Sequence, residues 1–238
     1  MPSVYNKNDN NGNENKTLIN INEQVRVKVR NDLIYAGFNV ESKVYESSSK
    51  SYDSIIKTVN DINKLLKEDE KSNNVRNIQI YFSNTPVYSY TPQENKLIGY
   101  KTVANIAFEF LIKEESDIKK MVSLQNKIMH FSQNNVNILI DRMRYSLTTN
   151  RQKNAELRAI RKAINLAKLK ASAVIETIGI SSYFIKEMTV NTTLANMEPL
   201  FRGPQALSAV AKSEGGNNDI ISEGYSDVIA TIDMKITV

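Results

Sequence analysis

The feature that most constrains this chain is a strict alternation of side chains between residues 98 and 112. Every second position carries a side chain suited to burial, while Lys101, Asn105 and Glu109 lie between them. A repeat of two is typical of a β-strand with one buried face and one face in water. The positions suited to burial are Ile98, Tyr100, Thr102, Ala104, Ile106, Phe108, Phe110 and Ile112.

This strand has a partner directly before it. Residues 76–90 also predict a strand, and Pro92 with the polar run QEN bends the chain between the two, which predicts one long hairpin. Pro86 has no backbone N–H and therefore confines the first strand to a sheet edge or a bulge. Cross-strand aromatic packing is the favoured role of the hairpin's tyrosines, and a subunit contact and stacking on bases are the alternatives. These tyrosines are Tyr81, Tyr88, Tyr90 and Tyr100.

The remaining patterns complete an α+β order. Strands are predicted over 18–29, 33–45, 136–147, 183–196 and 226–238, and helices over a stretch that begins at Ser47–Ser49, over 114–131 and over 150–178. The turn residues Asn31 and Asp32 predict that the first two strands pair with each other. The order is ββαββαβαββ, which is typical of helices packed on mixed, largely antiparallel sheets.

The third helix has the longest apolar pattern, and Gly179 follows it where a C-terminal cap needs positive φ. Its predicted buried stripe consists of Leu157, Ile160, Ile164, Ala167, Ala171, Val174, Ile175 and Ile178. Residues 151–178 hold seven basic and two acidic side chains, a surplus equal to the net charge of +5 of the whole chain. Arg158, Arg161 and Lys162 fall mostly outside the stripe and predict a solvated basic face, a candidate interaction surface.

The inventory of reactive groups predicts no enzyme. There is no cysteine, which excludes disulfides, thiolate zinc sites and a cysteine nucleophile. The one histidine, His130, has no neighbours at ligand spacing and is interpreted as structural or surface. Gly215-Gly216 lacks the Lys-Ser/Thr of a phosphate loop, and acidic pairs such as Asp69-Glu70 lie at helix ends. We therefore expect no catalytic residue, no metal site and no cofactor.

The ends and the longest connection differ from the rest. Residues 1–16, with six asparagines between positions 6 and 15, predict a disordered polar tether, followed by a single domain over 17–238. The tether lacks the apolar centre of a secretory signal, so either the protein is not exported or a leader has been removed. A long loop is predicted over 197–222, and its Leu200 and Phe201 are candidates for an oligomer contact or for local packing. No apolar run reaches the roughly 18 residues of a membrane-spanning helix.

Three stretches resemble the SIMPL domain family, a domain of unknown function. In IQIYFSNTPVYSYTPQENKLIGYKTVANIAFEF, the positions that match family motifs are Pro86, Tyr88, Gly99, Tyr100 and Asn105. The second stretch is the Ala-rich helix NAELRAIRKAINLAKLKASAVIETIGI with Gly179 near its end, and the third is the terminal strand ISEGYSDVIATIDMKITV, led by Gly224. The resemblance covers roughly residues 18–238, and these motif residues are structural in kind.

The resemblance implies a function and a place. The family includes periplasmic immunogenic proteins of Gram-negative bacteria and a mammalian protein that associates with a kinase. It implies a non-enzymatic, periplasmic or envelope protein that forms homo-oligomers, acts as a structural or interaction protein and is linked to oxidative-stress defence. The alternative is an intracellular adaptor that binds a protein or nucleic acid through the basic helix at 151–170; nucleic acid is the less favoured partner. Without an encoded leader, a cytoplasmic location is expected.

Overall fold

The chain forms two compact units, each with its own sheet and its own apolar core. The first unit is built from residues 1–30, 147–197 and 225–238, and the second from residues 31–146 and 198–224. The sequence predicted one domain over 17–238. The computed structural model describes residues 3–5, 17–72, 74–90, 95–132, 135–195 and 224–238.

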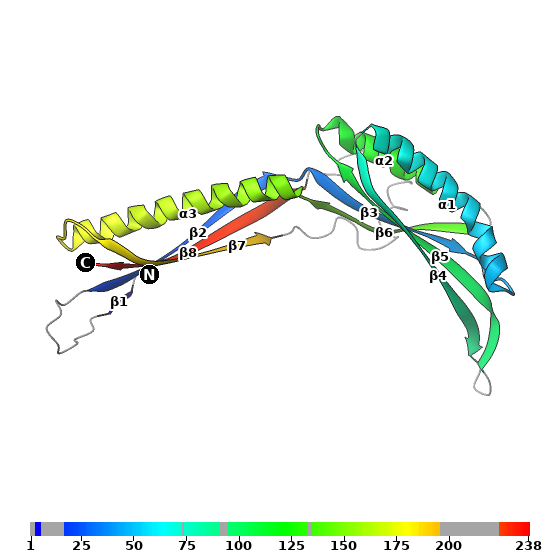
Figure 1. Ribbon diagram of the computed structural model, residues 1–238, viewed down its shortest axis with the longest axis horizontal. Coiled ribbons are helices and arrows are strands. Elements are labelled where there is room, and N and C mark those ends of the chain that lie inside the picture. Colours follow the sequence, from blue (N-terminus) through cyan, green and yellow to red (C-terminus); the bar gives the residue numbers. More distant parts are fainter. Residues whose placement is uncertain (1–2, 6–16, 73, 91–94, 133–134, 196–223) are drawn as a thin grey trace, which may run out of the picture. The chain divides into compact units, whose positions relative to one another are not determined.

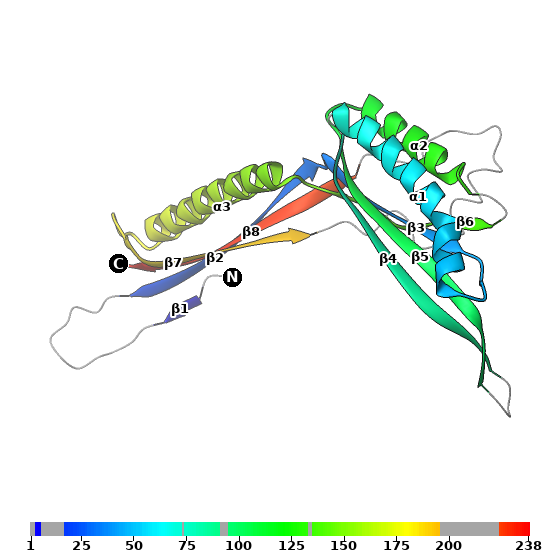
Figure 2. The same cartoon turned by 45° about the vertical axis from the view of Figure 1, so that its right-hand side comes forward.

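The first unit is one helix on one antiparallel sheet (Figure 2). Its strand order is β1-β2-β8-β7, and α3 (Thr149–Thr177) packs along the sheet. The strands are β1 (Ser3–Tyr5), β2 (Leu18–Arg30), β7 (Phe184–Ala195) and β8 (Tyr225–Thr237). Strand β1 pairs with β2 inside the segment for which a disordered tether was predicted, because β2 offers a free backbone edge there.

The second unit has two helices on one face of a four-stranded antiparallel sheet (Figure 1). The strand order is β4-β5-β3-β6. Its strands are β3 (Leu33–Ser42), β4 (Val75–Tyr90), β5 (Asn95–Leu111) and β6 (Val136–Ser146), and its helices are α1 (Ser48–Lys71) and α2 (Ser116–Met129). The stacked rings of Phe38 and Phe108, 6.0 Å apart, lie in the core under the helices.

The predicted element order ββαββαβαββ is confirmed from β2 onward, and so is the α+β fold. Strands β4 and β5 form the predicted long hairpin. Pro86 lies on β4, an edge strand, as its missing N–H requires. The start of α1 is capped by Ser47, whose side-chain oxygen accepts a hydrogen bond from the N–H of Lys50.

The predicted pairing of the first two strands is wrong. Strand β2 pairs along its whole length with the final strand β8, whereas β3 lies between β5 and β6 in the other sheet. Asn31 and Asp32 connect two sheets, and their backbone N–H groups donate to the carbonyls of Gly224 and Ser146. A period-two pattern indicates which face of a strand is buried, but it does not indicate which strand pairs with it. Here β2 forms its ladder with β8, which is distant in the sequence.

The buried stripe of α3 differs from the predicted one. A row of small side chains at intervals of four residues faces the sheet: Ala155, Ala159, Ala163, Ala167, Ala171 and Ile175. Leu157 is 52% exposed and Ile178 is 49% exposed, so both were wrongly assigned to the core. Because an alanine projects only a methyl group, this row allows the helix axis to lie close to β2 and β8 over about 43 Å of helix.

The end of α3 confirms the capping role predicted for Gly179. Its φ is 75°, its N–H donates to the carbonyl of Glu176, and the N–H of Ile180 donates to the carbonyl of Ile175. This pair of bonds is the Schellman motif, in which a left-handed residue closes the last helical turn. The helix therefore ends at the position that the sequence indicated.

Helix α2 begins around a buried carboxylate that the sequence did not single out. Asp117 has a side chain only 2% exposed, and its Oδ2 accepts from the backbone N–H groups of Lys113, at 2.8 Å, and Glu114, at 3.0 Å. Burial by itself would raise the pKa of Asp117, but the hydrogen bond from Lys120 and those two backbone bonds outweigh it and lower the pKa to about 2.

The alanine row predicts that larger side chains at its positions destabilise the first unit. We expect Ala163→Leu to lower the free energy of unfolding by about 1–3 kcal/mol, because added methyl groups would push α3 away from the sheet. Ala173→Leu is the matched control, since Ala173 lies on the same helix but is exposed. Urea denaturation of both variants is the measurement, and equal stability of the two would contradict close packing through the row.

The pKa of Asp117 predicts a pH dependence. Because the folded-state pKa lies below the ordinary value of 3.8, this carboxylate stabilises the fold above pH 4, and the contribution of about 2 kcal/mol disappears as the pH falls towards 2. Asp117→Asn removes this part of the acid-induced loss. Chemical denaturation at several pH values measures it. Asp61→Asn, at an exposed position of α1, serves as the control; an unchanged acid profile in Asp117→Asn would refute the assignment.

Candidate functional site

One concavity of the second unit lies on its sheet. We call it the sheet hollow: a depression of about 440 Å³ lined by residues of β3, β4, β5 and β6. Its side chains alternate with Phe38, Ile106 and Phe108, which point into the core under α1 and α2, so the hollow occupies the opposite face. The lining side chains are Tyr35, Gly37, Asn39, Asn77, Gln79, Asn105, Ala107, Glu109, Asp141, Arg142 and Arg144.

The floor of the sheet hollow is a row of small residues. Gly37 on β3 lies opposite Ala107 on β5. Ala107 is exposed, whereas Gly37 is buried beside the side chains of Asp141 and Arg142. Two residues along on the same face, Asn39 pairs with Asn105. Two residues in the other direction, Tyr35 pairs with Glu109. The depression is therefore bounded by amides at one end and by a ring and a carboxylate at the other.

Both flanking strands are irregular beside this floor. On β6 the register shifts so that Asp141 is an extra residue next to Arg142, which lies opposite Gly37. On β4 the register shifts between Arg76 and Gln79, and Asn77 has a φ of 53°. Bulges redirect side chains, and left-handed asparagines are uncommon outside turns, so two irregularities beside one row mark a specialised part of the sheet.

The charges of the sheet hollow are largely matched within it. Arg76 Nε lies 2.7 Å from Glu109 Oε2, and Arg142 Nε lies 3.4 Å from Asp141 Oδ2. The guanidinium of Arg144 lies 5.1 Å from the ring centre of Tyr35, within range of a cation–π contact. The hollow is thus polar and hydrogen-bonding without a strong field of either sign.

One amide in the sheet hollow has an unmatched acceptor. The Oδ1 of Asn39 is buried, and no hydrogen-bond donor among the described residues reaches it. A buried carbonyl oxygen without a donor costs about 1–3 kcal/mol. Because this oxygen is also closed to solvent, it is a local cost of the fold rather than an accessible binding group.

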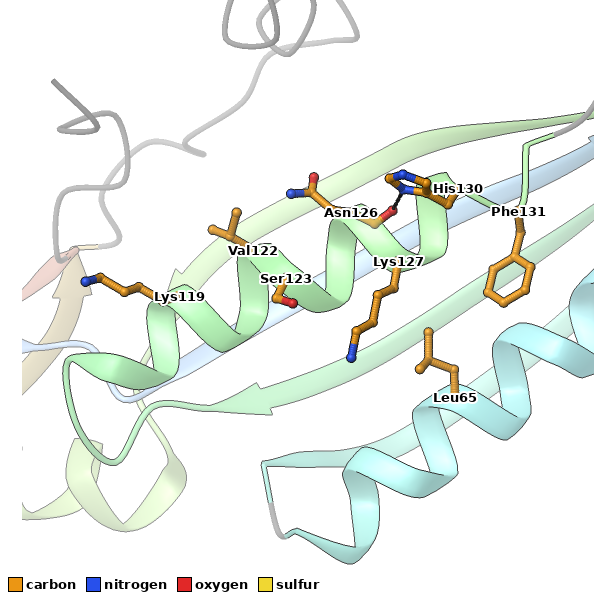
Figure 3. Close-up of a pocket in the computed structure, with 8 residues that line it drawn as sticks. All are labelled: Leu65, Lys119, Val122, Ser123, Asn126, Lys127, His130 and Phe131. Carbon is orange, nitrogen blue, oxygen red and sulfur yellow. Dashed lines mark hydrogen bonds between the residues drawn. The ribbon is translucent and has the colours of Figure 1, made fainter. Parts of the chain in front are cut away.

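A second concavity, the helix groove, lies between α1 and α2 (Figure 3). It contains His130, Lys119 and Lys127 but no carboxylate among its lining residues. In Figure 3 Lys127 and Phe131 point towards Leu65 on α1, whereas the ring of His130 turns towards the backbone of its own helix. Nδ1 of that ring lies 2.6 Å from the carbonyl oxygen of Asn126. The groove does not bring its polar groups to one point.

The acidic pairs at helix ends also separate. Glu115 precedes α2 without a side-chain capping bond, and the carboxylate of Asp117 accepts from the backbone N–H groups of Lys113 and Glu114 ahead of the helix. Asp69 is half-buried beside Lys127, and burial raises its pKa, against the lowering effect of that lysine. Neither pair brings two carboxyl groups together in a cavity.

A buried cluster of hydroxyls near the start of α1 is structural. Ser51 Oγ lies 2.9 Å from Ser42 Oγ and 2.7 Å from Thr102 Oγ1, and Asn84 donates to Thr102. These bonds tie α1 to β3, β4 and β5. No histidine or carboxylate belongs to the chain of bonds, so no base is present there to activate a hydroxyl.

The predicted interaction residues of the first unit lie on the exposed side of α3. Arg158, Arg161 and Lys162 are all exposed, and no carboxylate of the described chain forms an ion pair with them. Lys170 pairs with Glu23, an acid on the helix-facing side of β2. Leu169, 66% exposed, interrupts the basic surface. Leu200 and Phe201 lie outside the described residues.

Strand β7 forms the second exposed feature of the first unit. It pairs with β8 on one side, and no described strand pairs with its other side, which we call the β7 edge. Ten of its twelve residues are exposed, including Phe184 at 78%. A long strand with an unpaired ladder and apolar side chains is a template for another strand.

The motif residues have identifiable surroundings. At Gly99 an added Cβ would lie 2.4 Å from the carbonyl oxygen of Tyr45, where the backbone groups of Tyr45 and Tyr100 exchange two hydrogen bonds. At Gly224 it would collide with Tyr145. Tyr88, opposite Leu97, is 44% exposed, so close aromatic packing does not explain it. Asn105 lies on the sheet hollow.

Comparison with known families decides the identity. The family model described as SIMPL, protein of unknown function (DUF541), matches residues 19–236. The chain belongs to the SIMPL family. Among curated proteins no match was found. The match extends across both compact units, so this SIMPL chain has its two sheets within one family module.

The described residues contain no group of three or more histidine, cysteine, aspartate or glutamate side chains arranged to hold a metal ion. No helix among them has the length and apolar character to cross a bilayer.

Sequence reasoning missed the sheet hollow of this SIMPL protein. It named Asn105 only as a structural motif residue, and it did not single out Gly37, Asn39 or the arginines of β6. A signal was present, because Asn39 and Asn105 each alternate with the mostly apolar, buried positions of their strand. The sequence pattern does not show that Asn39 and Asn105 are neighbours, because only the register of β3 with β5 places them side by side.

Proposed function

We propose that this SIMPL protein is a non-enzymatic protein of the bacterial envelope that works as an oligomeric structural or interaction protein. The β7 edge is the observation that carries the proposal. The sequence supports the non-enzymatic part, since it has no cysteine and a single histidine. His130 itself bonds to a backbone carbonyl and lies in a groove without lining acids.

The β7 edge favours a second copy of the same chain as its partner. An antiparallel edge strand is self-complementary, because a two-fold axis places its unpaired N–H and C=O groups opposite those of its copy. Ile185 and Val190 lie on the helix-facing side of the sheet, at the register of Ile236 and Ile232, and remain partly exposed. A copied strand would extend this apolar layer and cover both side chains.

The location and the biological role rest on the family resemblance. The SIMPL family includes exported proteins of the bacterial envelope, which supports a periplasmic location. Its link to oxidative-stress defence supports a protective role exerted by an assembled surface rather than by a reaction. A fusion to a periplasm-specific reporter, made with the complete open reading frame, tests the location; signal in the cytoplasm alone would contradict it.

The oligomer gives a direct prediction. We expect the wild-type chain to have a mass in solution that is a multiple of 27.0 kDa, and we expect Phe184→Lys/Val190→Lys to shift it towards a single chain. Two charges on an edge strand oppose pairing with another strand while leaving the exposed side of β7 solvated. Light scattering coupled to gel filtration measures the mass.

The control is Leu169→Lys, which places a charge on the exposed side of α3 in the same unit. It leaves the mass of the assembly unchanged if strands form the contact. Circular dichroism shows that the variants are folded. A wild-type mass of 27.0 kDa, or an unchanged mass in the folded β7 variant, would refute assembly through the β7 edge.

A further inference from the structure

We propose that the sheet hollow is a binding site for a short, neutral glycan that carries hydroxyl and acetamido groups. The site is independent of the β7 edge, because all its lining residues belong to β3, β4, β5 and β6. Four observations support it: the size of the hollow, its amides, its internally matched charges and an exposed ring at its margin.

The shape suits a small ligand lying across the strands. A volume of about 440 Å³ falls within the range of about 300–1,000 Å³ that is typical of small-molecule sites. The open part of the floor is Ala107, whose side chain is a single exposed methyl group, while the side chains of Asp141 and Arg142 lie over the neighbouring Gly37. Both flanking bulges lie beside this row, so the chain departs from regular sheet where the hollow is deepest.

The amides supply the recognition chemistry. Gln79, Asn39 and Asn105 come from three adjacent strands, and each carries both a donor NH₂ group and an acceptor oxygen. A sugar hydroxyl is likewise both donor and acceptor, and an acetamido group matches an amide side chain with one N–H and one C=O.

The charges argue for a neutral ligand. Glu109 and Asp141 already pair with Arg76 and Arg142, so a charged ligand would have to compete with these carboxylates or guanidiniums. Arg144 is held over the ring of Tyr35. Guanidinium and carboxylate groups in such pairs still have unused N–H donors and lone pairs, which hydroxyl groups can reach without separating the charges.

An exposed aromatic ring lies at the margin of the sheet hollow. Tyr81 follows Gln79 on the same face of β4, its hydroxyl lies 3.4 Å from Gln79 Oε1, and its register partner is Asn105. It is 61% exposed, so the predicted packing against other tyrosines leaves most of it in solvent. A flat apolar ring beside amides suits the C–H face of a pyranose, with the hydroxyl groups directed at the amides.

A peptide fits this surface less well. The backbone of β3 and β5 is paired on both sides, so a peptide lying on the sheet face finds no free ladder of N–H and C=O groups. The helix groove is also a poorer site for a glycan, because its polar side chains do not converge (Figure 3).

The test uses the full chain and β-1,4-linked tri-N-acetylglucosamine as the probe. We expect binding with a dissociation constant in the micromolar to millimolar range, measured by calorimetry and by saturation transfer to the acetyl protons. Asn105→Ala is expected to weaken it at least about tenfold, the loss of one or two hydrogen bonds. Ala107→Leu is expected to abolish it, because the new side chain fills the floor; Ala107 is exposed, so the core is untouched.

Ala173→Leu is the matched control, an exposed alanine on α3 in the other unit, and it is expected to bind like wild type. Two further probes are acetyl-trialanine amide and inorganic phosphate. No binding of the trisaccharide at millimolar concentration, equal binding by Ala107→Leu and wild type, or tighter binding of either other probe would overturn the proposal. The mass in solution is recorded in parallel, so failure here and failure of assembly through β7 are separate results.

Discussion

The architecture depends on the pairing of the first long strand with the last. Strands β2 and β8 are joined over thirteen residue pairs, from Leu18 with Thr237 to Arg30 with Tyr225. The first unit therefore closes only when β8 is present, and the larger segment of the second unit, residues 31–146, is inserted between β2 and α3. Closing so long a loop costs entropy, which the long ladder and the apolar layer under α3 offset.

Each sheet has one apolar face that helices cover, and the other face is left to polar side chains. In the first unit this needs only α3, because its alanine row brings a single helix close to the strands. In the second unit larger side chains such as Phe38, Phe110 and Leu66 pack under two helices. Ile and Val are common to both cores, but the buried core of the first unit has six alanines and no aromatic residue, whereas that of the second has two alanines and three phenylalanines.

The sequence predicted elements well and partners poorly, for a physical reason. Alternation and capping are local, so β5, the N-cap at Ser47 and the cap at Gly179 were predictable. Pairing depends on contacts far apart in the sequence, so β2 was given β3 instead of β8. The buried stripe of α3 was predicted wrongly because leucine is more hydrophobic than alanine, so Leu157 was assigned to the core. In the structure, alanines face the sheet because their short side chains allow the helix to pack close to it.

The same limit explains the site. Asn39 and Asn105 are 66 positions apart in the chain as ordinary polar residues of two strands, and only the register of β3 with β5 makes them neighbours. The small floor between Gly37 and Ala107 arises from the same register, since a shift of one residue would place core side chains there instead. The strand pairing that buries the apolar core thus also creates the hollow, so a ligand site can arise on this sheet without a catalytic motif in the sequence.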